Sequence, residues 1–252
     1  MSARDRDAEA PPVLLCLPHA GGAATAFRHW KRPLSGVVDV VALEPPGRGA
    51  RRAEPLAKTM PDVVESLRER VLAATEGAER VALLGHSFGA LVARELADVL
   101  TDAGRPPALL VSVGLNAPTL PSAAEPMADL SDDELLEAVV ALGGVPDELR
   151  DEPDLLALFV EPLRTDLGIA ERFQRKRGER PLDCPVLALQ GADDPFVSPH
   201  GVREWREETT GPGSVTWFPG GHFFLHDPVF IRETLRPLLE RWLREGPRAV
   251  IG

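Results

Sequence analysis

The 252-residue chain has little or none of several residue types. It has no tyrosine, so no phenol can take part in its chemistry. It has no run of about 20 apolar residues, the length that a membrane-spanning helix needs, which argues against a membrane protein. Its two cysteines, Cys16 and Cys184, each lie within an apolar stretch. This usage argues against a disulfide framework or a cysteine-based zinc site, and predicts two buried thiols.

Positive charge is also scarce. The chain has 28 basic and 39 acidic residues, for a net charge of −11, which argues against nucleic acid as the main partner. The first residues, MSARDRDAEAPP, are charged and lack the apolar core of a secretory signal, so we expect a cytoplasmic protein. Apolar residues make up 44% of the chain, which predicts a folded globular protein.

Short apolar runs alternate with segments of helical periodicity. The runs are apolar along their whole length, as strands buried on both faces of a parallel sheet are. Strands are expected at 13–17, 37–43, 81–84, 109–115, 186–190 and 215–218, and helices at 23–34, 63–74, 88–100 and 229–244. We therefore predict an α/β protein that is a single domain over 1–252, with a mostly parallel, doubly wound sheet.

One segment, at about 117–181, departs from this alternation because it contains no convincing strand. Ser131 and Glu134 have the spacing of a capping box, which predicts a helix that runs to about Leu142. Pro153 and Pro162 are expected to punctuate two further helices. We interpret the segment as a helical lid over one end of the sheet, with an ordinary helical elaboration as the alternative.

The strongest local motif is GHSFG at 85–89, which reads G-x-S-x-G between an expected strand and an expected helix. A sharp turn at this junction would expose the hydroxyl of Ser87, and its neighbours two positions away must be small. The N-terminus of the following helix favours developing negative charge. Ser87 is the candidate nucleophile, and the alternative is a serine that only caps the helix.

A serine nucleophile needs a base, and His222 is the candidate. It lies in GGHF at 220–223, late in the chain, as the order serine, acid, histidine requires. His226 is its rival, four residues further on. The side chain of His86 is expected to point away from the turn and to pack, and His29 and His200 are expected in surface helices.

Asp194 is the candidate acid, in QGADDP at 190–195 after the fifth strand. The following proline holds Asp194 extended, and Asp193 is expected to cap the turn. The oxyanion hole needs backbone N–H donors. We expect them from Phe88 and from Ala20, with Gly21 as the alternative to Ala20. His19, in the same loop, is expected to shape it.

Five motifs together are similar to those of type II thioesterases that accompany modular polyketide and nonribosomal peptide synthases. They are PHAGG at 18–22, PPGRGARR at 45–52, GHSFGA at 85–90, LQGADDP at 189–195 and GGHFF at 220–224, in family order across nearly the whole chain. The resemblance implies an α/β-hydrolase fold with a helical lid and a triad of Ser87, Asp194 and His222. It also implies hydrolysis of acyl or aminoacyl groups from the phosphopantetheine of carrier proteins, with no metal or cofactor.

Other functions fit the same residues. A chain-releasing cyclase or a free-standing carboxylesterase would use the same triad, and a protein of this fold could also dock on a synthase without catalysis. The expected partner is a carrier-protein domain and the expected oligomeric state is a monomer. Two basic clusters could receive the carrier, although such runs are more often solvated faces. They are Arg48, Arg51 and Arg52, and Arg172, Arg175, Lys176, Arg177 and Arg180.

Overall fold

The computed structural model describes residues 12–120, 125–144 and 153–246. They form a six-stranded sheet in the order β2-β1-β3-β4-β5-β6, and each pair of neighbouring strands is parallel. The strands are β1 (Val13–Leu17), β2 (Asp39–Ala42), β3 (Val81–His86), β4 (Leu109–Val113), β5 (Val186–Gly191) and β6 (Gly213–Phe218). The prediction of an α/β fold with a doubly wound parallel sheet is confirmed.

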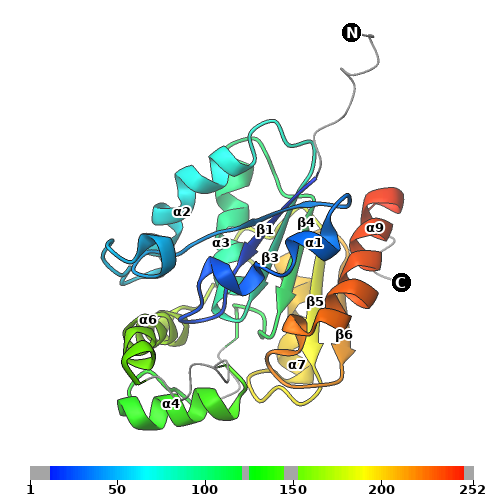
Figure 1. Ribbon diagram of the computed structural model, residues 1–252. Coiled ribbons are helices and arrows are strands. Elements are labelled where there is room, and N and C mark those ends of the chain that lie inside the picture. Colours follow the sequence, from blue (N-terminus) through cyan, green and yellow to red (C-terminus); the bar gives the residue numbers. More distant parts are fainter. Residues whose placement is uncertain (1–11, 121–124, 145–152, 247–252) are drawn as a thin grey trace.

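Helices cover both faces of the sheet (Figure 1). Alternate residues of a strand point to opposite faces, so Leu15 and Leu17 pack on one side and Leu14 and Cys16 on the other. The first side carries α2 (Met60–Ala74) and α3 (Phe88–Asp102), and the second carries α1 (Lys31–Leu34) and α9 (Arg236–Glu245). The two layers of core explain why the central strands β1, β3, β4 and β5 are buried along their whole length, whereas the edge strands β2 and β6 are only partly buried.

Several elements begin or end elsewhere than predicted, for local reasons. The expected strand at 37–43 shortens to β2 because the N–H groups of Val37 and Val38 donate to the carbonyl of Leu34 and close the turn after α1. The expected helix at 23–34 is two short helices, Ala24–Phe27 and α1. The helix α2 begins at Met60, earlier than expected, because Thr59 forms a capping box there with its first turn.

Two helices lie between β4 and β5, namely α4 (Asp132–Ala141) and α6 (Pro153–Arg172). The predicted capping box of Ser131 is present. The prediction of two helices separated at Pro162 is wrong, since α6 continues through it. Proline removes one backbone hydrogen bond, but Leu163 and Ile169 beyond it are buried in the core and hold the helix together. Residues 121–124 and 145–152 of the expected lid lie outside the described residues.

The expected C-terminal helix at 229–244 is interrupted. It consists of α8 (Pro228–Phe230), a π-helical turn (Ile231–Leu235) and α9. Pro237 has no N–H to donate, and the wider turn comes directly before it. Within the part of the chain that the structure describes, no helix combines the length and apolarity needed to cross a bilayer.

The sheet order places a crevice between β1 and β3. The chain leaves β1 toward β2 and leaves β3 toward β4, so the loops after these neighbouring strands diverge. In such sheets, ligands bind at the carboxyl ends of the strands where the order reverses. This edge is also the one that α4 and α6 approach (Figure 1).

Candidate active site

Ser87 lies at the turn between β3 and α3 with φ 53° and ψ −120°, a conformation rare for a residue with a side chain. Its N–H donates to the carbonyl oxygen of Val113 at 2.8 Å, which anchors the turn to β4. A Cβ on Gly85 would lie 2.1 Å from the carbonyl oxygen of Gly89, and one on Gly89 would lie 2.3 Å from that of Leu17. The turn therefore requires both glycines of the G-x-S-x-G motif.

His222 and Asp194 form a buried pair. The Nδ1 of His222 lies 2.8 Å from Oδ2 of Asp194, and the other carboxylate oxygen accepts the N–H of Phe196 at 2.9 Å. With Nδ1 donating to the carboxylate, the Nε2 of His222 is the nitrogen left to act as a base. Asp193, by contrast, is exposed, and its N–H donates to the carbonyl of Gly220 at 3.0 Å. The structure thus brings His222 together with the second of the two adjacent aspartates.

Gly114, which follows β4, makes room for this pair. Its φ is +65°, and an added Cβ would lie 3.0 Å from Cε1 of His222 and 3.3 Å from Oδ2 of Asp194. The sequence alone did not point to Gly114. Its position directly after a buried strand, at the carboxyl edge of the sheet, is the signal that could have done so.

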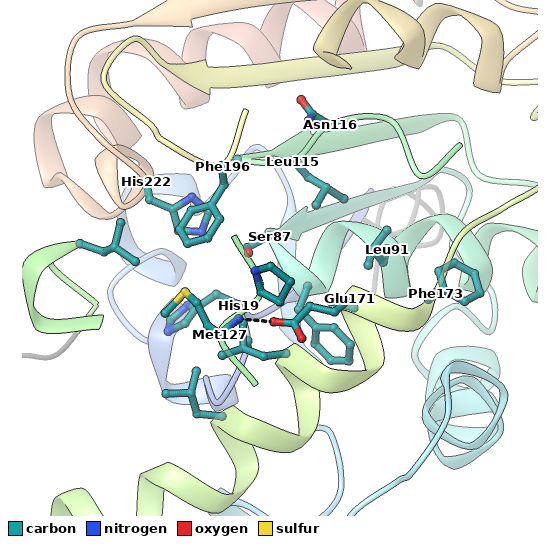
Figure 2. A pocket seen from close by; sticks show the side chains of 18 of the residues that line it. His19, Ser87, Leu91, Leu115, Asn116, Met127, Glu171, Phe173, Phe196 and His222 are labelled. Atoms are coloured by element: carbon teal, nitrogen blue, oxygen red, sulfur yellow. Dashed lines mark hydrogen bonds between the residues drawn. The ribbon is translucent and has the colours of Figure 1, made fainter. Parts of the chain in front are cut away.

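Ser87 and His222 line one cavity of about 350 Å³ (Figure 2). Its walls are mainly apolar and come from the sheet edge and from the two helices between β4 and β5. These apolar residues include Leu91, Leu115, Val139, Leu142, Leu163, Leu167, Phe173 and Phe196. A cavity of this volume and lining is suited to a small apolar group.

The candidate oxyanion-hole residues, Ala20 and Phe88, are both buried and line the same cavity. Phe88 is the first residue of α3, where no preceding turn offers its N–H a carbonyl. The N–H of Gly21 instead donates to Oδ2 of Asp166 at 2.8 Å. Since the amide of Gly21 is engaged, the geometry favours Ala20 as the donor in this loop.

Asp166 connects three segments. It lies on α6 and is 2% exposed, and both its carboxylate oxygens contact the guanidinium of Arg48 in the loop after β2. Together with the Gly21 contact, this ion pair ties α6 to the loop after β1. No sequence motif singled out Asp166. The signal that could have pointed to it is an acidic residue among the apolar positions of a helix, next to Leu163, Leu167 and Ala170.

The remaining histidines take different positions. His86 is fully buried and does not line the cavity, and its Nε2 lies 2.8 Å from the carbonyl oxygen of His222. His226 makes no hydrogen bond to Asp194, and His19 lies on the cavity wall (Figure 2). His29 and His200 are exposed, as expected.

Most of the arginines of the two basic clusters are engaged within the protein. Arg48 and Arg51 are buried, and pair with Asp166 and Glu54. Arg175 is 8% exposed and its guanidinium contacts Glu95 and Glu208. Its assignment to a solvated face or to a carrier-binding surface is therefore wrong. Arg177 and Arg180 pair at 2.5 Å with Glu204 and Asp102, respectively.

The comparisons with known proteins agree with this architecture. A model of the thioesterase domain matches residues 12–237. The chain is 39% identical to the thioesterase PikA5 of Streptomyces venezuelae over 219 residues. The aligned region covers 85% of this chain and 75% of PikA5.

Two solved structures are similar as well. One is RedJ, a thioesterase from the prodiginine pathway of Streptomyces coelicolor, with a TM-score of 0.82 and 37% identity over 92% of this chain and 86% of that chain. The other is BorB, a type II thioesterase from the borrelidin biosynthetic cluster, with a TM-score of 0.79 and 35% identity. The match covers 88% of this chain and 90% of the BorB chain. The chain therefore belongs to the thioesterase family, as a type II thioesterase of polyketide and nonribosomal peptide pathways.

Proposed function

We propose that this thioesterase hydrolyses acyl and aminoacyl groups from the phosphopantetheine arm of carrier proteins, and so edits stalled or mis-primed synthases. Ser87, His222 and Asp194 form its catalytic triad. The observation that carries the proposal is the buried 2.8 Å contact between His222 and Asp194, in a cavity that also holds Ser87. Thioesterases of this family use no cofactor, so the protein's own groups perform the reaction.

The first half of the reaction forms an acyl-enzyme. The Oγ of Ser87 attacks the thioester carbonyl while Nε2 of His222 takes its proton, and Asp194 stabilises the resulting imidazolium. The amides of Phe88 and Ala20 donate to the tetrahedral oxyanion. When the intermediate collapses, the C–S bond breaks and the departing sulfur takes the proton from His222.

The second half returns the free enzyme. Nε2 of His222 removes a proton from water, whose oxygen attacks the ester carbonyl of acylated Ser87. The second intermediate collapses with cleavage of the bond to Oγ, which regains the proton from His222. The products are the carboxylic acid and free Ser87, and no oxidant or reductant is consumed.

The helices between β4 and β5 act as the lid in this proposal, over about residues 117–181 of one domain. Support comes from the apolar walls that α4 and α6 contribute to the cavity. A cavity of about 350 Å³ suits an acyl chain of short to medium length. A carrier-protein domain is the partner, and the thioesterase acts on it as a monomer.

A chain-releasing cyclase and a carboxylesterase remain the competing functions, because they would use the same triad. The test is turnover of an acyl-carrier protein by wild type and Ser87→Ala, with analysis of the released product. We expect free acid from wild type and at least about a 10³-fold loss in Ser87→Ala. A cyclised product would favour the cyclase, faster turnover of p-nitrophenyl esters would favour the carboxylesterase, and full activity of Ser87→Ala would refute the mechanism.

A further inference from the structure

Three histidines that the proposed mechanism does not use lie close to one another, and one of them, His86, lies next to His222. They are His19 in the loop after β1, His86 at the end of β3, and His226 in the short 3-10 helix Phe224–His226. One ring nitrogen of each lies within 4.8 Å of those of the other two. The ring centroids are 5.3 to 6.0 Å apart and the rings meet edge to face.

Each of the three imidazoles has a nitrogen without a partner. Nδ1 of His19, Nδ1 of His86 and Nε2 of His226 are buried, and within the described ranges of the chain no group is hydrogen-bonded to them. A buried polar atom without a partner costs free energy, and normally has a bound ion or water to explain it. All three of these atoms belong to the one cluster of histidine rings.

The hydrogen bond of His86 defines its tautomer. A carbonyl oxygen only accepts, so Nε2 of His86 must donate its proton to the carbonyl of His222. Nδ1 of His86 then carries a lone pair. Histidines that bind metals usually donate their second ring N–H to a carbonyl or carboxylate in this way, which orients the ring.

The three rings also lie in a desolvated environment. Burial holds the pKa of His19 and of His86 well below the usual value and lowers that of His226 to about 4, and the other histidines add to each shift.

We propose that His19, His86 and His226 form a binding site for a divalent transition metal, with Zn²⁺ as the best match. Imidazole nitrogen is a preferred zinc ligand, and three histidines with a water complete a tetrahedron. The nitrogens of such a site lie about 3.3 Å apart, so the rings need to close by about 1.5 Å at most. The site takes no part in the thioester chemistry.

Occupancy of this site would reach the catalytic base through His86. Its ring lies 4.8 Å from that of His222, centroid to centroid, and its N–H holds the carbonyl of His222. Drawing the His86 ring toward a metal therefore shifts the loop that carries His222. We expect Zn²⁺ to raise the melting temperature and to slow hydrolysis of acyl-N-acetylcysteamine, reversibly with EDTA.

The experiment titrates the untagged, EDTA-treated full chain with Zn²⁺ by calorimetry, and with Co²⁺ by visible absorption. We expect one equivalent of Zn²⁺ to bind and Co²⁺ to show the intense bands of tetrahedral nitrogen coordination. His226→Gln should bind Zn²⁺ at least about tenfold more weakly, since loss of a ligand costs no less than loss of an outer-shell partner. Its melting temperature without metal shows whether it is folded.

Two matched variants separate this site from others. His200→Gln removes an exposed histidine, and should bind Zn²⁺ like wild type. His222→Ala keeps the carbonyl that orients His86, and should also bind. Zn²⁺ binding that persists unchanged in a folded His226→Gln variant, that is lost in His222→Ala, or that is absent from wild type would overturn the proposal.

Discussion

Asp193 and Asp194 are adjacent in the chain, but their carboxylates lie in different environments. Asp194 is buried against His222, whereas Asp193 is exposed. The proline that follows Asp194 was a local signal for this difference. The neighbouring pair therefore offers a matched test of the triad, because the same change can be made at either position.

We expect Asp194→Asn to lower kcat by about 10⁴-fold, since an amide in this place favours the wrong tautomer of the histidine. Asp193→Asn should change kcat by less than about twofold, because its side chain faces solvent. Steady-state hydrolysis of acyl-N-acetylcysteamine measures both. Comparable losses in the two variants would contradict the assignment of Asp194.

Gly114 and Gly104 are a second pair of positions at which the same substitution can be compared. Both glycines have positive φ, +65° and +73°, so alanine strains the backbone by about 1–2 kcal/mol at either site. A Cβ at Gly104 meets no atom within 4 Å, whereas one at Gly114 presses on His222 and Asp194. The two changes therefore differ only in what the new methyl group contacts.

We expect Gly114→Ala to lose at least as much free energy of unfolding in urea as Gly104→Ala, and only Gly114→Ala to lose activity, by at least about tenfold. A displacement of about 1 Å in a catalytic group can cost that much or more. Equal kcat values for the two variants would show that Gly114 does not position the pair.

At the scale of elements, the contact of Asp166 with Arg48 and Gly21 couples α6 to the loop after β1, which holds the proposed oxyanion-hole residue Ala20. Gly21 has a φ of +70°, and an added Cβ would lie 2.8 Å from the ring of Phe159 and 2.9 Å from Leu163. The loop after β1 therefore packs against α6 too closely for a side chain at position 21. Displacement of α6 would disturb the amide of Ala20.

A double substitution separates the contribution of this contact to the stability of the protein from its contribution to the position of the loop after β1. Arg48→Met alone leaves a buried carboxylate unpaired and should destabilise the protein by about 3–5 kcal/mol. Arg48→Met with Asp166→Leu removes both charges and should regain most of that free energy. Its kcat should nonetheless lie below that of wild type, because Asp166→Leu removes the acceptor of the Gly21 N–H.

Urea unfolding and kcat on a thioester substrate check this prediction. Full recovery of both quantities in the double variant would show that Asp166 serves stability alone. Recovery of neither would show that the ion pair is required for folding.

At the scale of the whole molecule, the net charge of −11 opposes approach to a carrier protein, because carriers are usually acidic too. The engaged arginines make a compensating basic surface smaller than the sequence indicates. Screening by salt should therefore help the two proteins to meet.

We expect kcat/KM for an acyl-carrier protein to rise several-fold between about 0.01 and 0.15 M salt, as the Debye length falls from about 30 to 8 Å. The value for acyl-N-acetylcysteamine, which carries no carrier domain, should stay constant over the same range. A fall of kcat/KM with salt for the carrier substrate would instead indicate attraction to a local basic patch.

Local patterns were sufficient for much of this protein. Apolar runs predicted the central strands, because a strand buried on both faces is largely apolar along its length. The G-x-S-x-G motif predicted the turn at Ser87, since two backbone segments pass too close for a Cβ at Gly85 or Gly89. The five motifs also pointed to the family that the comparisons show.

The contacts that only the tertiary structure decided join residues far apart in the chain. Arg48 and Asp166 are 118 positions apart, and His86 and His222 are 136 apart. No local periodicity encodes such pairs, because they form only when the fold brings the loops after β2 and β6, the end of β3 and the helix α6 to one edge of the sheet. The same packing buries Arg175 against α3 and carries α6 through Pro162, since the free energy of core burial outweighs the local preference for solvent or for a break.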